Sequence, residues 1–111
     1  MTMKIIGWKW IINFQNKFYP KWRTEKPALL FSTALAGEVG SICGVVTHLE
    51  GGGTNQREYS SRMVLHESVD SYIQIILLLA KYGFSAKDFE AEFKRIQEEL
   101  EGRLKKKEGL K

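Results

Sequence analysis

The sequence predicts an all-α protein, a four-helix bundle that forms a single domain over residues 1–111. Three observations indicate this fold class. Apolar residues recur at helical spacing in four segments, helix-capping residues stand at several of their ends, and no segment shows the alternation typical of a β-strand. With 111 residues, the chain is long enough for one hydrophobic core but not for two.

The first expected helix covers residues 3–19. Ile5, Trp8 and Ile12 lie near helical spacing there, and Pro20 ends the element. The following residues, 20–26, are expected to form a polar connection. The chain contains three tryptophans that could stack on a nucleotide base: Trp8, Trp10 and Trp22. Because aromatic residues at helical spacing are more often part of a core, a core role is expected for them.

The second expected helix begins with Pro27 in its first turn and runs from Ala28 without a breaker until Gly51. Glycine in a helix costs about 0.5–1 kcal/mol relative to alanine, so something must offset it. The helix contains five small residues: Ala34, Ala36, Gly37, Gly40 and Gly44. Two explanations are equally compatible with them, namely tight packing against another helix or close approach of a ligand near Glu38.

The third expected helix runs from about Arg57 to Tyr82, after a glycine-rich loop that lacks the Gly-Lys-Ser/Thr of a phosphate-binding loop. Asn55 and Glu58 form a potential capping box at its start, and Gly83 is suited to cap its end. The helix is apolar nearly all round in its second half, which is typical of a central helix or one at a subunit interface.

The fourth expected helix opens with a capping box formed by Ser85 and Asp88. Five residues mark an apolar stripe along it: Phe89, Phe93, Ile96, Leu100 and Leu104. Its basic end, residues 105–111, is expected to be a frayed and solvated helix terminus. Binding of nucleic acid by this tail is ranked last among the functional hypotheses, because no base-reading motif accompanies it.

Carboxylates inside the two most apolar helices are the strongest functional signal. Glu38 lies within the second helix, and Glu67 and Asp70 lie within the third. Residues three apart on a helix lie about 60° apart around its axis, so Glu67 and Asp70 share a face and can share a cation. Hard oxygen ligands suit Mg²⁺. We therefore expect a metal site between the two helices, with ion pairing to Arg or Lys of a neighbouring helix as the alternative.

The two histidines and the single cysteine are expected to have no part in this site. His48 lies about 15 Å beyond Glu38 along a helix, and His66 lies about 100° around the helix from Glu67, so neither is expected to ligate the metal. Cys43 is the single cysteine, which excludes an internal disulfide and fits a cytoplasmic protein. No signal peptide is evident, and the longest uninterrupted apolar run is too short to span a membrane.

The order of these acidic motifs resembles that of the MazG-like superfamily of all-α nucleoside triphosphate pyrophosphohydrolases. LLFSTALAGEVGSICG (29–44) is similar to that family's first motif, which usually reads like ALxxEVGEL. LHESVDSYIQIIL (65–77) is similar to its second motif, which usually reads like EELxDVLxYL. The resemblance covers roughly residues 10–105.

The resemblance implies that Glu38, Glu67 and Asp70 are catalytic residues that bind Mg²⁺, with Mn²⁺ as an alternative ion, and that nucleoside triphosphates are cleaved to monophosphate and pyrophosphate. It also implies a substrate-binding role for Lys94 and a homodimeric or homotetrameric assembly. Ser41 stands where the family has a second glutamate, as a weaker, neutral candidate for contact with the substrate. That change supports a second hypothesis, in which the bundle has lost catalysis and serves as a binding or assembly module.

Overall fold

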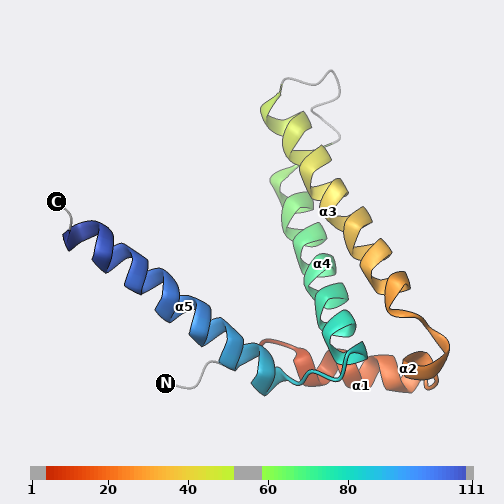
Figure 1. The fold of residues 1–111 in the computed structure, drawn as a ribbon. Coiled ribbons are helices and arrows are strands. Elements are labelled where there is room, and N and C mark those ends of the chain that lie inside the picture. The colour runs from red at the N-terminus through yellow and green to blue at the C-terminus, as the bar shows by residue number, and fades with distance from the viewer. Residues whose placement is uncertain (1–4, 52–58, 110–111) are drawn as a thin grey trace.

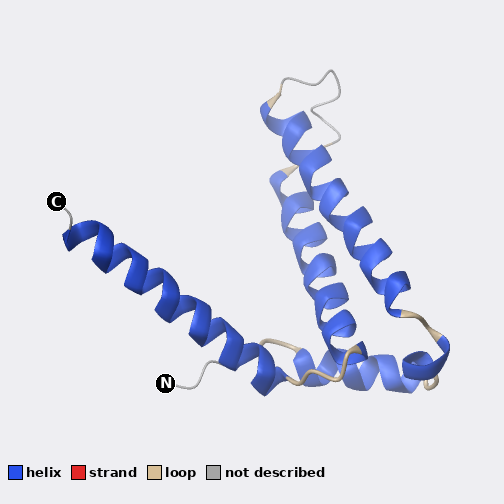
Figure 2. Cartoon of the chain, in the orientation of Figure 1, coloured by secondary structure: helices blue, strands red, loops and turns tan. Residues whose placement is uncertain are grey.

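The computed structural model describes residues 5–51 and 59–109, and in these ranges the chain is all-helical without a strand (Figure 2). The helices are α1 (Trp8–Phe18), α2 (Trp22–Glu25), α3 (Ala28–Glu50), α4 (Ser61–Lys81) and α5 (Ala86–Gly109). Helices α3 and α4 form an antiparallel hairpin, α1 and α2 lie across the base of that hairpin, and α5 leaves the base at a wide angle (Figure 1). The predicted all-α class is confirmed.

The ends of the helices follow local backbone chemistry. Helix α1 starts at Trp8, later than predicted, because Gly7 before it adopts a left-handed conformation with φ of 73°. Gly83 ends α4 in the predicted way. Its φ is 87°, its N–H donates to the carbonyl of Ala80 at 3.0 Å, and the next N–H, of Phe84, donates to the carbonyl of Leu79 at 3.1 Å. These two bonds satisfy carbonyls that the helix end would otherwise leave unpaired.

The capping box at the start of α5 is also confirmed. The backbone N–H of Ser85 donates to Asp88 Oδ2 at 2.8 Å, and the N–H of Asp88 donates to Ser85 Oγ at 3.4 Å. The capping box proposed for Asn55 and Glu58 lies outside the described residues. Helix α4 begins at Ser61, later than predicted, and Ser60 before it has an extended backbone with φ of −138° and ψ of 157°.

The segment predicted as a polar connection, residues 20–26, contains the short helix α2, and this prediction was wrong in that respect. Trp22 is 1% exposed, and its indole Nε1 donates to Asn16 Oδ1 at 2.8 Å. Arg23 Nη1 donates to the carbonyl of Ala80 at 2.9 Å, and Lys81 Nζ donates to the carbonyl of Arg23. Burial of one tryptophan and these bonds to the end of α4 hold the segment in place.

The core lies where α1, α2 and the hairpin meet. It consists of seven buried residues: Trp8, Ile11, Trp22, Phe31, Ile76, Leu77 and Ala80. Two of the three tryptophans are core residues as expected. Trp10 is 62% exposed, so the core role predicted for it was wrong. Trp8 and Trp10 are two residues apart, which places them about 160° apart around α1, and only one of them can face the hairpin.

A single copy of the chain is not compact. Its radius of gyration is 18.1 Å, whereas a compact domain of this length has about 13 Å. Helix α5 has no buried residue over its 24 positions. One copy therefore does not complete the predicted four-helix bundle, because its last helix contacts the rest of the chain near its start, where Phe89 meets Trp8 at a ring separation of 6.3 Å.

Helices α3 and α4 are each long and apolar enough to cross a membrane, judged by length and composition alone. The length of the longest uninterrupted apolar run, which was the criterion applied to the sequence, was too strict a test for a membrane-spanning helix. Core helices of soluble proteins pass the same test. Both helices carry carboxylates near their middles, and carboxylates are costly inside a bilayer. That the protein does not associate with a membrane stays a prediction.

Replacement of Ile76 by alanine tests the core at the hairpin base. Ile76 is fully buried, so Ile76→Ala is expected to lower the free energy of unfolding by about 2–5 kcal/mol. Leu65→Ala, on the same helix but 56% exposed, is the matched control and should cost about 1 kcal/mol or less. Chemical denaturation followed by circular dichroism measures both, and equal losses would contradict this location of the core.

Candidate metal centre

Three carboxylates converge in the middle of the hairpin. Glu38 comes from α3, and Glu67 and Asp70 come from successive turns of α4. One carboxylate oxygen from each lies within 4.8 Å of the others, and all three residues are partly buried. The i,i+3 spacing accounts for the pair on α4, while the antiparallel packing of the hairpin brings the third carboxylate opposite them. The residues predicted to form one site are thus placed together.

The electrostatics of this cluster show that like charges are crowded. The pKa of Glu38 is raised, chiefly by a hydrogen bond between its carboxyl group and that of Glu67, then by partial desolvation and by repulsion from the charges of Glu67 and Asp70. Two carboxyl groups share a hydrogen bond only when one of them carries a proton. A proton or a cation held among the three carboxylates would offset this repulsion.

His66 lies at the edge of the cluster. Its Nε2 is 3.2 Å from Asp70 Oδ2, one helical turn further along α4, and its charge opposes the rise in the pKa of Glu38. This contact was not predicted, because only the position of His66 relative to Glu67 was considered, although the i,i+4 spacing to Asp70 was the available signal. His48 instead stacks on Tyr59, with ring centroids 4.1 Å apart.

The alternative explanation of the cluster, ion pairing with basic side chains, receives no support. Within residues 5–51 and 59–109, no Arg or Lys forms a salt bridge with Glu38, Glu67 or Asp70. The salt bridges of Arg95 and Arg103 stay within α5. The only cationic group at the cluster in the described part of the chain is the imidazole of His66, when protonated.

The donor set fits a hard divalent cation. Mg²⁺ binds oxygen at about 2.0–2.1 Å in octahedral geometry, so ligands on opposite sides of the ion are about 4.2 Å apart. The oxygen separations of up to 4.8 Å in the cluster are close to that limit, and small side-chain rotations would close the difference. Glu38, Glu67 and Asp70 are the residues that would hold the ion.

Ser41, the residue in place of a fourth carboxylate, is exposed on α3 one turn after Glu38. The small residues around it do not mediate tight packing within the chain. A Cβ added at Gly37, Gly40 or Gly44 would meet no atom within 4 Å. These glycines therefore do not pack tightly against another helix of the same copy, and the face of α3 that they share is open.

Lys94 is not brought to the cluster within one copy. It is exposed on α5, which diverges from the hairpin (Figure 1). The charged groups that shift the pKa of Glu38 are Glu67, Asp70 and His66, and Lys94 is not one of them.

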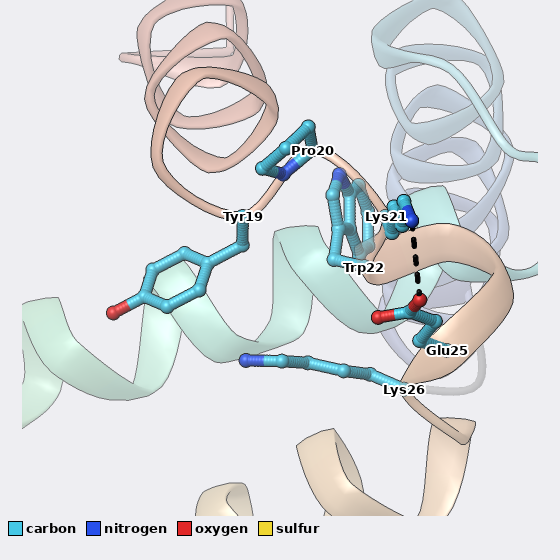
Figure 3. A pocket seen from close by; sticks show the side chains of 6 residues that line it. All are labelled: Tyr19, Pro20, Lys21, Trp22, Glu25 and Lys26. Carbon is cyan, nitrogen blue, oxygen red and sulfur yellow. Dashed lines mark ion pairs between the residues drawn. The ribbon is translucent and has the colours of Figure 1, made fainter.

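A separate shallow pocket lies at the turn between α1 and α2 (Figure 3). Its volume is about 230 Å³, and its lining residues are Tyr19, Pro20, Lys21, Trp22, Glu25 and Lys26. The charged groups in it already have partners: Lys21 Nζ is 3.9 Å from Glu25 Oε1, and Lys26 Nζ lies 4.2 Å from the centre of the Tyr19 ring. None of these residues belongs to the acidic cluster, which is the better candidate site.

Comparisons with protein families, curated proteins and solved structures found no match to this chain. The fold and the site together define an all-helical protein with a carboxylate cluster suited to a divalent cation. Any more particular assignment rests on the residues themselves.

Replacement of Glu38 separates a metal site from a structural ion pair. The pKa of Glu38 is raised in the folded protein, so between its ordinary pKa and the raised one the folded state binds more protons than the unfolded state. Without metal, the free energy of unfolding should therefore fall as pH rises through that interval. In a chelator at neutral pH, Glu38→Gln should therefore raise Tm, and it should also abolish the rise in Tm that Mg²⁺ gives the natural protein. Thermal unfolding with EDTA or Mg²⁺ measures both effects.

The matched control for this experiment is Glu50→Gln, which changes the same residue type at the end of α3. It should leave the metal response intact. If Glu38→Gln had a lower Tm than the natural protein in EDTA, this would contradict the inference that repulsion among the carboxylates destabilises the metal-free protein.

Proposed function

We propose that this protein is a Mg²⁺-dependent nucleotide pyrophosphohydrolase that cleaves nucleoside triphosphates to monophosphate and pyrophosphate. The observation that carries the proposal is the convergence of Glu38, Glu67 and Asp70 from two packed helices without an Arg or Lys partner in the described residues. The resemblance of the two acidic motifs to the MazG-like superfamily supplies the reaction. Mn²⁺ is an alternative ion for the same oxygen ligands.

The chain's contribution to this chemistry is a rigid placement of negative charge. Glu67 and Asp70 are held one turn apart by α4, and the hydroxyl of Ser71 donates to the carbonyl of Glu67 at 2.9 Å in that turn. Glu38 approaches from the facing helix. When bound there, Mg²⁺ supplies neutralisation of phosphate charge and orientation of an attacking water. The open, glycine-rich face of α3 leaves the neighbourhood of Glu38 accessible to a phosphate chain.

Of the two residues predicted to contact the substrate, Ser41 lies near Glu38 in the same copy, whereas Lys94 does not. Ser41 is exposed one turn from Glu38 and can donate a hydrogen bond to a phosphate oxygen or a metal-bound water. Lys94 would contribute only from the α5 of another copy, since its own α5 leads away from the hairpin (Figure 1).

A second candidate function is supported by the absence of a fourth carboxylate. With Ser41 in that position, the described cluster has three acidic residues and less charge to offset two metal ions. A MazG-like bundle that binds nucleotide and metal without turnover, as a binding or assembly module, would have this composition.

Hydrolysis of a panel of nucleoside triphosphates distinguishes these functions. With Mg²⁺ or Mn²⁺, the natural sequence is expected to release monophosphate and pyrophosphate, and Glu67→Gln should lower kcat at least about 100-fold because it removes a metal ligand. Separation of products by anion-exchange chromatography measures this, with Glu50→Gln as a control of unchanged activity.

A Ser41→Glu variant completes the design. Activity gained only in this variant would favour the impaired module, since a restored carboxylate would then restore the reaction. Inactivity of the natural sequence and of Ser41→Glu, with no binding of nucleotide by either, would contradict both candidate functions.

The assembly proposed with this function is a homodimer or homotetramer in the cytoplasm. The support lies in the large apolar side chains that one copy leaves in solvent and in its large radius of gyration. Sedimentation velocity at micromolar concentration should show at least a dimer. A stable monomer at that concentration would contradict the assembly.

A further inference from the structure

Helix α1 carries an aromatic ladder, defined as Trp10, Phe14 and Phe18, on the side that does not face the core. The three rings follow one another at intervals of four residues, with centroids 5.1 Å and then 4.6 Å apart. Their exposed fractions are 62%, 43% and 56%. Three neighbouring rings that are each about half exposed to water are unfavourable, so the ladder indicates a contact that one copy does not make.

Helix α5 carries a second uncovered apolar surface. The α5 stripe is defined as Phe93, Ile96, Leu100 and Leu104, and each member is between 44% and 57% exposed. At its inner end lies a hollow of about 430 Å³ whose lining is almost wholly apolar and includes Val69, Tyr72 and Phe93. Helices of this kind gain most of their stability from packing of the apolar face, which here has no partner within the described chain.

The two surfaces are comparable in length, and each has charged residues beside it. At 1.5 Å per residue, the ladder spans about 12 Å and the stripe about 16 Å. The charged residues of α1 are Lys9 and Lys17, and neither forms a salt bridge within the described residues. The stripe is bordered by Glu90 and Glu101 on one side. On the other side lie Glu92 and Glu99, which form salt bridges with Arg95 and Arg103 of the same helix. Glu90 and Glu101 form no salt bridge within the described residues, so they are the carboxylates available to Lys17 of a second copy.

We propose that the aromatic ladder of one copy packs against the α5 stripe of a second copy, and that a two-fold axis repeats the contact. Such an arrangement covers both apolar surfaces of both copies and closes the assembly at a dimer. With seven half-exposed side chains from each copy, the contact would bury roughly 1,200 Å², which is the lower end of the range for stable complexes. The contact does not depend on the metal site or on the proposed hydrolysis.

An anionic lipid surface is the competing occupant of the ladder, since aromatic and Lys residues on one helix suit such a surface. The α5 stripe argues against it, because Glu90 and Glu101, which border the stripe without a salt bridge in the described residues, would be repelled by anionic lipid. A second copy accounts for both surfaces, whereas a lipid surface accounts for one.

Cross-linking between single-cysteine variants tests this pairing. Cys43 is the only cysteine, so Cys43→Ser gives a clean background for Phe14→Cys and Leu100→Cys, both at exposed positions. The two variants are mixed, allowed to exchange subunits and treated with a short bis-maleimide. The expected result is at least about tenfold more cross-linked dimer from the mixture than from either variant alone. Leu29→Cys, 72% exposed on α3, replaces Phe14→Cys as the matched control and should give little product.

Three results would overturn the proposal. The first is efficient cross-linking of Phe14→Cys alone, which would show that the ladder pairs with itself. The second is a protein that stays monomeric in sedimentation at micromolar concentration. The third is a monomer that binds phosphatidylglycerol vesicles and loses that binding in Phe14→Ser. Nucleotide hydrolysis is measured separately, so a result that contradicts the dimer contact does not contradict the proposed hydrolysis, and the reverse also holds.

Discussion

Packing at the base of the hairpin is the interaction on which the rest of the structure depends. The indole of Trp22 lies edge-on to the ring of Phe31, with centroids 5.7 Å apart, and donates its N–H to Asn16. Ile76 of α4 is fully buried in the same cluster. Because these contacts join α1, α2, α3 and α4 at one point, they set the relative placement of the two long helices. The position of every carboxylate in the candidate site follows from that placement.

Repulsion within the acidic cluster opposes this packing. Helix contacts at the base hold α3 against α4, while the charges of Glu38, Glu67 and Asp70 repel one another across the same interface. The site remains partly open to water, which screens the repulsion and makes the crowding tolerable. A shared proton or a bound cation removes the remaining cost. The residues that repel one another across the hairpin are therefore the ones that would hold a cation.

The helices were largely predictable from the sequence because helix boundaries depend on neighbouring residues. The end of α4 at Gly83 and the start of α5 at Ser85 rest on hydrogen bonds within a few residues of each other. Helix α2 was not predicted, since its four residues are held by burial of Trp22 and by bonds from distant parts of the chain. Periodicity cannot reveal an element so short.

The sequence by itself determined the helical class, the long helices and the pair formed by Glu67 and Asp70, because residues three apart on a helix share a face whatever surrounds it. Only the tertiary structure decided that Glu38 meets that pair, that Trp10 faces water while Trp8 and Trp22 are buried, and that α5 departs from the hairpin (Figure 1). Those outcomes depend on how whole helices dock. A single helix carries the same apolar pattern whether its partner lies in its own chain or in another copy.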